Sequence, residues 1–94
     1  MSYWKNRYEY CQLLNDFINS DIDGLRFESE FYKMMRTDRD RNKASKLGDV
    51  LSRIFTACDV FDPDPETRTE YEYGETELRN FVRDIFAENR NLFE

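Results

Sequence analysis

Apolar residues recur at the spacing of an α-helix in four separate stretches of this 94-residue chain. An α-helix repeats about every 3.6 residues, so apolar residues three and four positions apart lie on one face of it. Four such faces, separated by short polar stretches, must pack against one another to be shielded from water. The pattern therefore predicts an all-α protein, a single antiparallel four-helix bundle.

The same stripes give the helix positions. We expect the first helix at residues 2–19 and the second after Asp23, which can cap it while Ile22 and Phe27 form a hydrophobic staple. The third is expected to be ended by Pro63 and Pro65, and the fourth to open at residues 74–76. The predicted core residues are Trp4, Tyr8, Cys11, Leu14 or Asn15, Ile18, Phe27, Phe31, Met34, Met35, Leu47, Val50, Leu51, Ile54, Phe55, Cys58, Phe61, Leu78, Phe81, Val82, Ile85, Phe86 and Leu92.

Chain length and hydropathy favour one cytoplasmic domain. Residues 1–94 suffice for one domain with one modest core. No apolar run approaches the roughly 18 residues of a spanning helix, and the opening MSYWKNRYEY lacks the apolar block of a signal peptide. We therefore expect no membrane association. Cys11 and Cys58 lie in apolar helical patterns and are expected to be reduced core residues, the alternative being one disulfide.

The charge is concentrated in one short window. Residues 59–77, DVFDPDPETRTEYEYGETE, hold eight acidic side chains and one basic one, a net charge of −7, whereas the whole chain carries −6. Such a patch accelerates association with a basic partner and disfavours direct nucleic-acid binding.

A purely structural explanation of this window covers part of it. Glu75 and Glu77 would complement the dipole of the fourth helix, Asp62 and Asp64 are ordinary turn residues, and Tyr71 and Tyr73 would pack the loop on the bundle. Stability alone gives no reason to concentrate eight like charges, so we favour a functional role.

Catalysis and metal binding find little support in the residues. The chain has no histidine, no Gly-rich phosphate loop, and no serine or cysteine beside a candidate base, so we expect no enzyme, no catalytic residues and no cofactor. Asp62, Asp64 and Glu66 alternate as calcium ligands do. Pro63 and Pro65 occupy the positions between them, however, and the glycine of a calcium loop is missing, so we predict no metal site.

A smaller basic segment, RTDRDRNKASK at residues 36–46, has five basic and two acidic side chains. It could contact RNA, but Asp38 and Asp40 dilute its charge and no aromatic residue is interleaved to stack on bases. A solvated loop is the favoured interpretation.

Two stretches carry a resemblance to a known family. LLNDFINSDIDGLRFESEFYKMM and IFTACDVFDPDPETRTEYEYGETELRNFVRDIF are similar to the colicin D immunity family, the self-protective colicin-like immunity proteins, which include those of contact-dependent inhibition systems. The distinctive element is Phe61, Asp62, Pro63 and Asp64 at the end of a helix, and the likeness spans residues 13–86.

The resemblance implies an antitoxin that binds the nuclease domain of a cognate tRNA-cleaving toxin in a one-to-one complex. In this family the inhibitor fills the basic active site as a mimic of the RNA backbone. Matched to the family motif, Asp59, Asp62 and Asp64 would be the central phosphate mimics. Position and charge then place Glu66, Glu70, Glu72 and Glu75 at the rim of the toxin-binding surface, with Tyr71 and Tyr73 as aromatic anchors.

Two alternative functions stay open at this point. An acidic regulatory module would bind some other basic protein through the same window. A homo-oligomeric structural module would self-associate, with the aromatic N-terminus as its contact.

Overall fold

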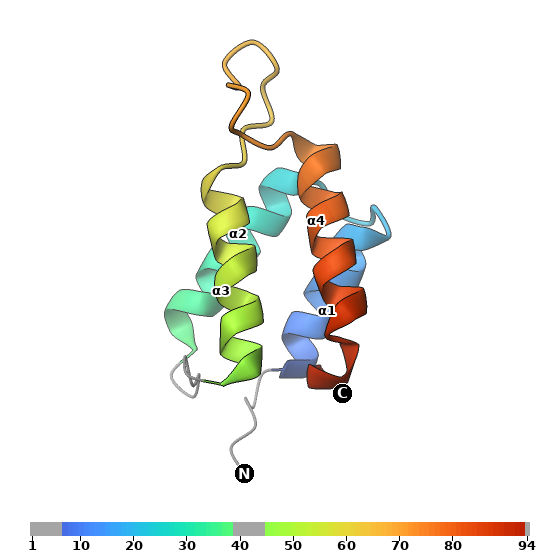
Figure 1. Cartoon of the computed structure of the whole chain (residues 1–94). Helices are drawn as coiled ribbons and strands as arrows, with labels where there is room; N and C mark the ends of the chain where they lie inside the picture. The colour runs from blue at the N-terminus through green and yellow to red at the C-terminus, as the bar shows by residue number, and fades with distance from the viewer. Residues whose placement is uncertain (1–6, 39–44, 94) are drawn as a thin grey trace.

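The fold is a bundle of four helices. The structure, a computed structural model, describes residues 7–38 and 45–93. Its elements are α1 (Arg7–Ile18), α2 (Gly24–Thr37), α3 (Lys46–Asp59), α4 (Glu75–Glu88) and a short 3-10 helix (Arg90–Leu92). Figure 1 shows that the chain reverses direction from each helix to the next. Strand structure within the described ranges is one isolated parallel bridge, Phe61 to Tyr73. The predicted all-α four-helix bundle is confirmed.

Local capping chemistry sets where α2 and α3 begin. The Asp23 side chain accepts a hydrogen bond of 2.8 Å from the backbone N–H of Arg26, which confirms Asp23 as the N-cap of α2. Ser45 caps α3 in the same way, accepting from the N–H of Gly48 at 3.0 Å. These side chains satisfy backbone donors that the first helical turn leaves without partners.

The apolar stripes of α2, α3 and α4 pack as their spacing predicts. Buried side chains from these helices include Phe27, Phe31 and Met35 of α2, Leu51 and Ile54 of α3, and Leu78 and Val82 of α4. Phe17 of α1 stacks on Phe27 with ring centroids 4.3 Å apart. Packing of this kind joins all four helices around one core.

The buried face of α1 is shifted from the predicted one, although Leu14 is buried and Cys11 and Ile18 are partly buried against the core. Tyr8 is 58% exposed and Cys11 is half-buried, whereas Tyr10, Leu13, Leu14 and Phe17 are buried. Both sets fit a helical period and share Leu14, and packing of the helices buries the second set. The Tyr10 hydroxyl donates to the buried carboxylate of Asp38 at 3.2 Å, so Asp38 is not part of a solvated loop as predicted. The described residues do not include Trp4 or the predicted start of this helix at residue 2. They also leave out most of the basic segment.

The end of α3 also differs from the prediction. The helix stops at Asp59, before the prolines, because the N–H of Val60 turns back to the carbonyls of Ala57 and Cys58. Phe61 therefore follows the helix, yet it is buried. At the other end of the chain, Phe93 is fully buried against Phe86, a core residue that the helical spacing did not predict.

Both cysteines are free thiols, as expected. Burial raises the pKa of Cys58 to about 12, with smaller contributions from the nearby charges of Glu28 and Asp59. A thiol with so high a pKa holds almost no thiolate at neutral pH and is chemically inert. The structure thus supports a packing role for Cys58.

Candidate functional site: the acidic loop

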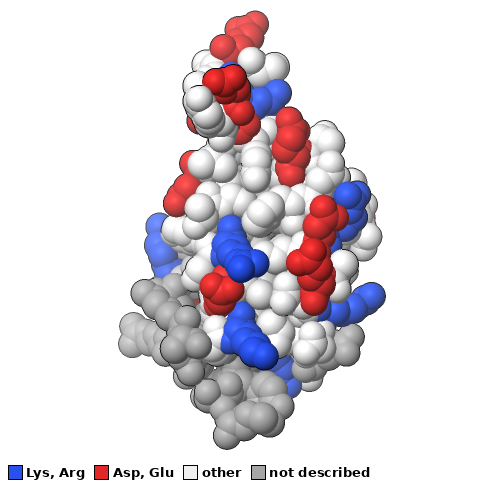
Figure 2. Space-filling view, in the orientation of Figure 1, with Lys and Arg blue, Asp and Glu red and all other residues white. Residues whose placement is uncertain are grey.

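The acidic loop, residues 62–72, projects beyond the helices at one end of the bundle (Figure 1). It connects α3 to α4, and its side chains are mostly exposed. Figure 2 shows that acidic side chains gather on this projection, whereas acidic and basic side chains are mixed on the bundle face below it. The loop therefore presents most of the negative charge of the window away from the rest of the protein.

Backbone hydrogen bonds close the base of the loop. The N–H of Tyr73 donates to the carbonyl of Val60 at 2.7 Å, and the N–H of Asp62 donates to the carbonyl of Tyr73 at 2.8 Å. The Tyr73 ring packs 6.0 Å from that of Phe81 on α4. These contacts fix both ends of the loop to the bundle, so Tyr73 has a structural role at the base of the loop.

Asp62 and Asp64 organise the turns of the loop. The carboxylate of Asp62 accepts from the N–H of Asp64 at 2.9 Å and from the hydroxyl of Thr67 at 2.7 Å. Asp64 accepts from the N–H of Glu66 at 2.9 Å, and its own carbonyl accepts from the N–H of Arg68 at 3.0 Å. Consecutive turns of this kind are typical of aspartate beside proline. They give the loop a defined shape before any partner binds.

The hydrogen bonds to Asp62 predict that the stability of the loop depends on pH. The Thr67 hydroxyl, the Asp64 N–H and the charge of Arg68 lower the pKa of the Asp62 carboxyl. Because the folded pKa lies below the unfolded value of about 4, the ionised carboxylate stabilises the loop above that pH. The stabilisation is lost as pH falls through the folded pKa. We expect an NMR titration of Asp62 to show a midpoint below the ordinary aspartate value.

The variant Thr67→Val provides the control for this titration, because valine keeps the shape of threonine and removes the hydroxyl donor. Its Asp62 midpoint should move back toward the ordinary value. An ordinary midpoint in the wild-type protein, or no change in Thr67→Val, would contradict the hydrogen-bonded arrangement.

Arg68 and Gly74 complete the base of the loop. The guanidinium of Arg68 donates to the carbonyl of Asp62 at 3.3 Å and lies directly against Gly74, the N-cap of α4. A side chain at position 74 would overlap the guanidinium. The only basic residue of the acidic window is therefore directed inward, where it joins the two sides of the loop, a role that the charge pattern of the sequence did not indicate.

Asp59 lies apart from the loop turns. Its carboxylate accepts a hydrogen bond of 2.6 Å from the Tyr32 hydroxyl of α2, and the Tyr32 ring packs against Phe55 at 4.8 Å. Burial, the hydrogen bond to Asp59 and its charge raise the pKa of Tyr32, and burial together with the Asp59 charge raises that of Glu28. The structure thus holds Asp59 at the α2–α3 contact and does not group it with Asp62 and Asp64.

Glu75 is partly buried and engaged at a junction between helices, which separates it from the other predicted rim residues. One carboxylate oxygen accepts from the N–H of Gly24 at the start of α2, and the other pairs with Arg79 at 3.2 Å. Arg79 in turn donates to the carbonyl of Phe17 in α1 at 2.9 Å. Glu75 therefore ties three helices together at the loop end of the molecule.

The remaining predicted residues lie on the loop surface. Glu66 and Glu70 are exposed, and Tyr71 is 80% exposed, the most exposed large apolar side chain of the described chain. Glu72 is half-buried and accepts from the N–H of Thr69 at 2.8 Å. An aromatic ring so exposed on an ordered loop is typical of a binding surface.

Metal-binding and membrane-spanning features are absent from the part of the chain that the structure describes. There, no three histidine, cysteine or acidic side chains are arranged to hold a metal ion. None of the helices in residues 7–38 and 45–93 is long and apolar enough to cross a membrane.

A protein-family model matches the chain across the whole bundle. The model of the bacterial self-protective colicin-like immunity family matches residues 7–88, which include all four helices and the acidic loop. Comparisons with curated proteins and with solved structures found no match. Because the family match extends over most of the chain, this protein belongs to the bacterial self-protective colicin-like immunity family.

Proposed function

We propose that this immunity protein binds the nuclease domain of a cognate tRNA-cleaving toxin and blocks its active site with the acidic loop. The observation that carries the proposal is the projecting loop, whose carboxylates are held in place by internal hydrogen bonds. Family membership supports a self-protective role against a toxin. The nuclease target and the mimicry of RNA are our inference.

The chemistry of the loop suits a phosphate-binding cleft. A cleft that cleaves RNA holds phosphates with Lys and Arg donors, and carboxylates satisfy the same donors through charge-assisted hydrogen bonds. A loop ordered in advance loses less conformational entropy when it binds. The internal turns of the loop thus favour tight binding by an otherwise small element.

The geometry suggests different roles for the central residues. Both oxygens of Asp62 already accept hydrogen bonds within the loop, whereas exposed Asp64 uses only Oδ1 in the described contacts. We assign Asp64 the main contact with the toxin, and Asp62 the role of holding it while adding charge. Asp59 contributes from the edge of this surface.

The surrounding side chains would shape the rest of the interface. Glu66 and Glu70 steer association, Tyr71 is the aromatic anchor, and Glu72 and Tyr73 support the loop from within. Glu75 contributes through the bundle junction. We propose a one-to-one complex in the cytoplasm, where tRNA is found, against a toxin delivered as a bacteriocin or by contact-dependent inhibition.

A binding competition tests this function. A catalytically inactive nuclease domain of the toxin encoded beside this gene is titrated with the protein by calorimetry, at low and at physiological salt. We expect nanomolar or tighter binding that weakens with salt. The protein should also displace tRNA already bound to that domain, because both occupy one cleft.

If the nuclease domain bound tRNA and the immunity protein at the same time, blocking of the active site would be overturned. The protein would then confer immunity by a different mechanism. No binding to this domain would overturn the proposed function and favour an acidic regulator of another basic protein.

A further inference from the structure

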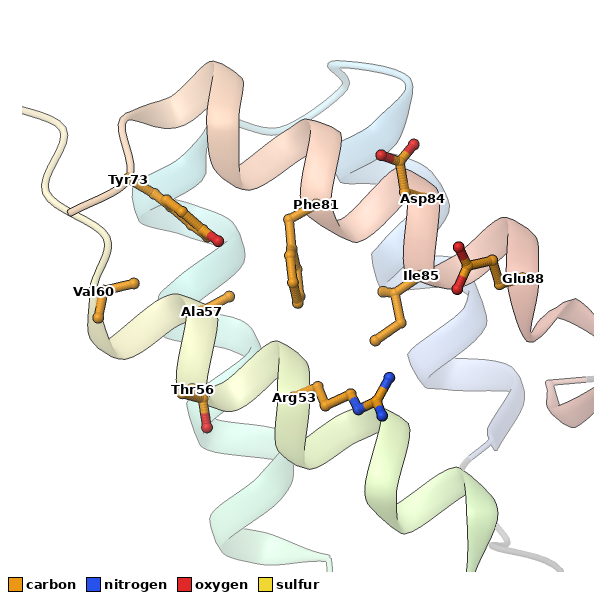
Figure 3. Close-up of a pocket in the computed structure, with 9 residues that line it drawn as sticks. All are labelled: Arg53, Thr56, Ala57, Val60, Tyr73, Phe81, Asp84, Ile85 and Glu88. Carbon is orange, nitrogen blue, oxygen red and sulfur yellow. The ribbon is translucent and has the colours of Figure 1, made fainter. Parts of the chain in front are cut away.

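A groove between α3 and α4 lies beside the base of the acidic loop. Its volume is about 550 Å³, and apolar side chains from both helices form its floor, notably Ala57, Phe81 and Ile85. Figure 3 shows the Phe81 ring extending from α4 toward α3. Phe81 belongs to the apolar stripe of its helix yet is only half-buried. The bundle therefore leaves part of this stripe uncovered.

The size and lining of the groove suit a docked side chain. Pockets that bind ligands have volumes of about 300–1,000 Å³ and are mostly apolar with a few polar groups. Here Ala57 and Ile85 are buried, while Val60 and Tyr73 close the end nearest the loop. An apolar side chain entering the groove would shield these surfaces from water.

The groove and the acidic loop are continuous. Val60 and Tyr73 line the groove, and the hydrogen bond between them closes the base of the loop. A partner whose cleft surrounds the loop must therefore come close to the groove between α3 and α4. The loop has eleven residues, whereas a stable interface uses about 20–30 residues on each side. The loop alone is too small to form such an interface.

The charges at the rim define the partner chemistry further. Arg53 pairs with Asp49 at 3.4 Å, and Asp84 pairs with Arg83 at 3.4 Å. Glu88 is exposed at the same rim and forms no ion pair within residues 7–38 and 45–93, so it offers an acceptor for a basic group. An apolar side chain flanked by lysine or arginine matches this combination.

We propose that the α3–α4 groove is a second toxin-binding region, which takes an apolar side chain, flanked by a basic one, from the rim of the toxin's nuclease cleft. The inference rests on the proposed function. Charges at the rim of the loop govern how fast the complex forms, whereas a desolvated apolar contact, like the central contact of Asp64, slows its dissociation. The groove therefore determines which toxin is retained.

Filling the groove tests this inference. Thr56 is an exposed residue of α3 that lines the groove, so Thr56→Trp places a large ring there without disturbing the core. Binding kinetics are measured with the inactive nuclease domain of the toxin encoded beside this gene. We expect dissociation to be faster by roughly tenfold or more, with an unchanged association rate and unchanged salt dependence.

Two controls separate the outcomes. Thr56→Ala leaves the groove open, and Gln12→Trp adds the same ring on exposed Gln12 of α1; both should bind like wild type. An unchanged dissociation rate in a folded Thr56→Trp variant would overturn the inference about the groove. Tight binding by the wild-type protein would still uphold the proposed function. The inference is also overturned if Thr56→Trp abolishes self-association and leaves toxin binding intact, because a second copy would then occupy the groove. Absence of wild-type binding would overturn both proposals.

Discussion

Lysine at position 64 is expected to abolish tight toxin binding while leaving the bundle folded. Asp64 is exposed at the turn of the acidic loop, and within residues 7–38 and 45–93 its carboxylate accepts one hydrogen bond, from the N–H of Glu66. Asp64→Lys would place a positive charge against the basic residues of the nuclease cleft. Reversing a charge at the centre of an interface costs about 2–5 kcal/mol, roughly thirtyfold to several-thousandfold in affinity. Calorimetry with the inactive nuclease domain measures the loss.

A matched charge reversal makes this result specific to the loop. Glu9→Lys produces the same change in net charge on exposed Glu9, in the first turn of α1 at the end of the bundle opposite the loop (Figure 1). It should reduce the association rate only slightly, since its charge lies far from the contact. Equal losses for the two variants would show that net charge, and not the loop, drives binding.

A second comparison tests the separate roles of the two central aspartates. Asp62→Asn keeps a side-chain acceptor for the N–H of Asp64 and an amide group beside the Thr67 hydroxyl, so the turn is retained without its charge. Asp62→Lys removes both the charge and the turn. If Asp62 mainly supports Asp64, the Asp62→Asn variant should bind the nuclease domain far more tightly than Asp62→Lys does, although more weakly than the wild-type protein.

The sequence predicted the helices well because their apolar stripes are local and strongly periodic. The stripe of α3 from Leu47 to Cys58 fits one helical face, and that face is buried. In α1 two overlapping faces both fit the period, and contacts with other helices, among them those with Phe27 and Phe31 of α2, select the face with Tyr10 and Phe17. Periodicity thus identifies a helix more reliably than it identifies the buried side.

The candidate site was predicted by position but not by contact. Charge density located the loop, and turn chemistry around Asp62 and Asp64 agrees with the hydrogen bonds found there. The engagement of Glu75 with Gly24 joins residues 51 positions apart, and Tyr32 reaches Asp59 across 27. No local pattern encodes such pairings, because each depends on how the helices meet.

The second large expected effect concerns the stability of the core. A charged substitution at Ile54 tests it most directly. Ile54 is fully buried in the middle of α3. Ile54→Asp removes a well-packed side chain, at a cost of about 2–5 kcal/mol, and buries a carboxylate without a partner, which adds about 1–3 kcal/mol or more. A domain of this size is stable by only about 5–15 kcal/mol. We expect the variant to lose its cooperative unfolding transition. A urea titration monitored by circular dichroism measures this loss.

Two milder substitutions determine whether burial is the cause. Ser52→Asp introduces the same charge two residues away on exposed Ser52 and should change the free energy of unfolding by no more than about 0.5 kcal/mol. Ile54→Val removes one methylene and should cost about 0.5–1.5 kcal/mol. Leu47 is a weaker test, because an aspartate in the first turn of α3 would interact favourably with the helix dipole. A cooperative, near-wild-type transition in Ile54→Asp would mean that α3 does not form the centre of the bundle.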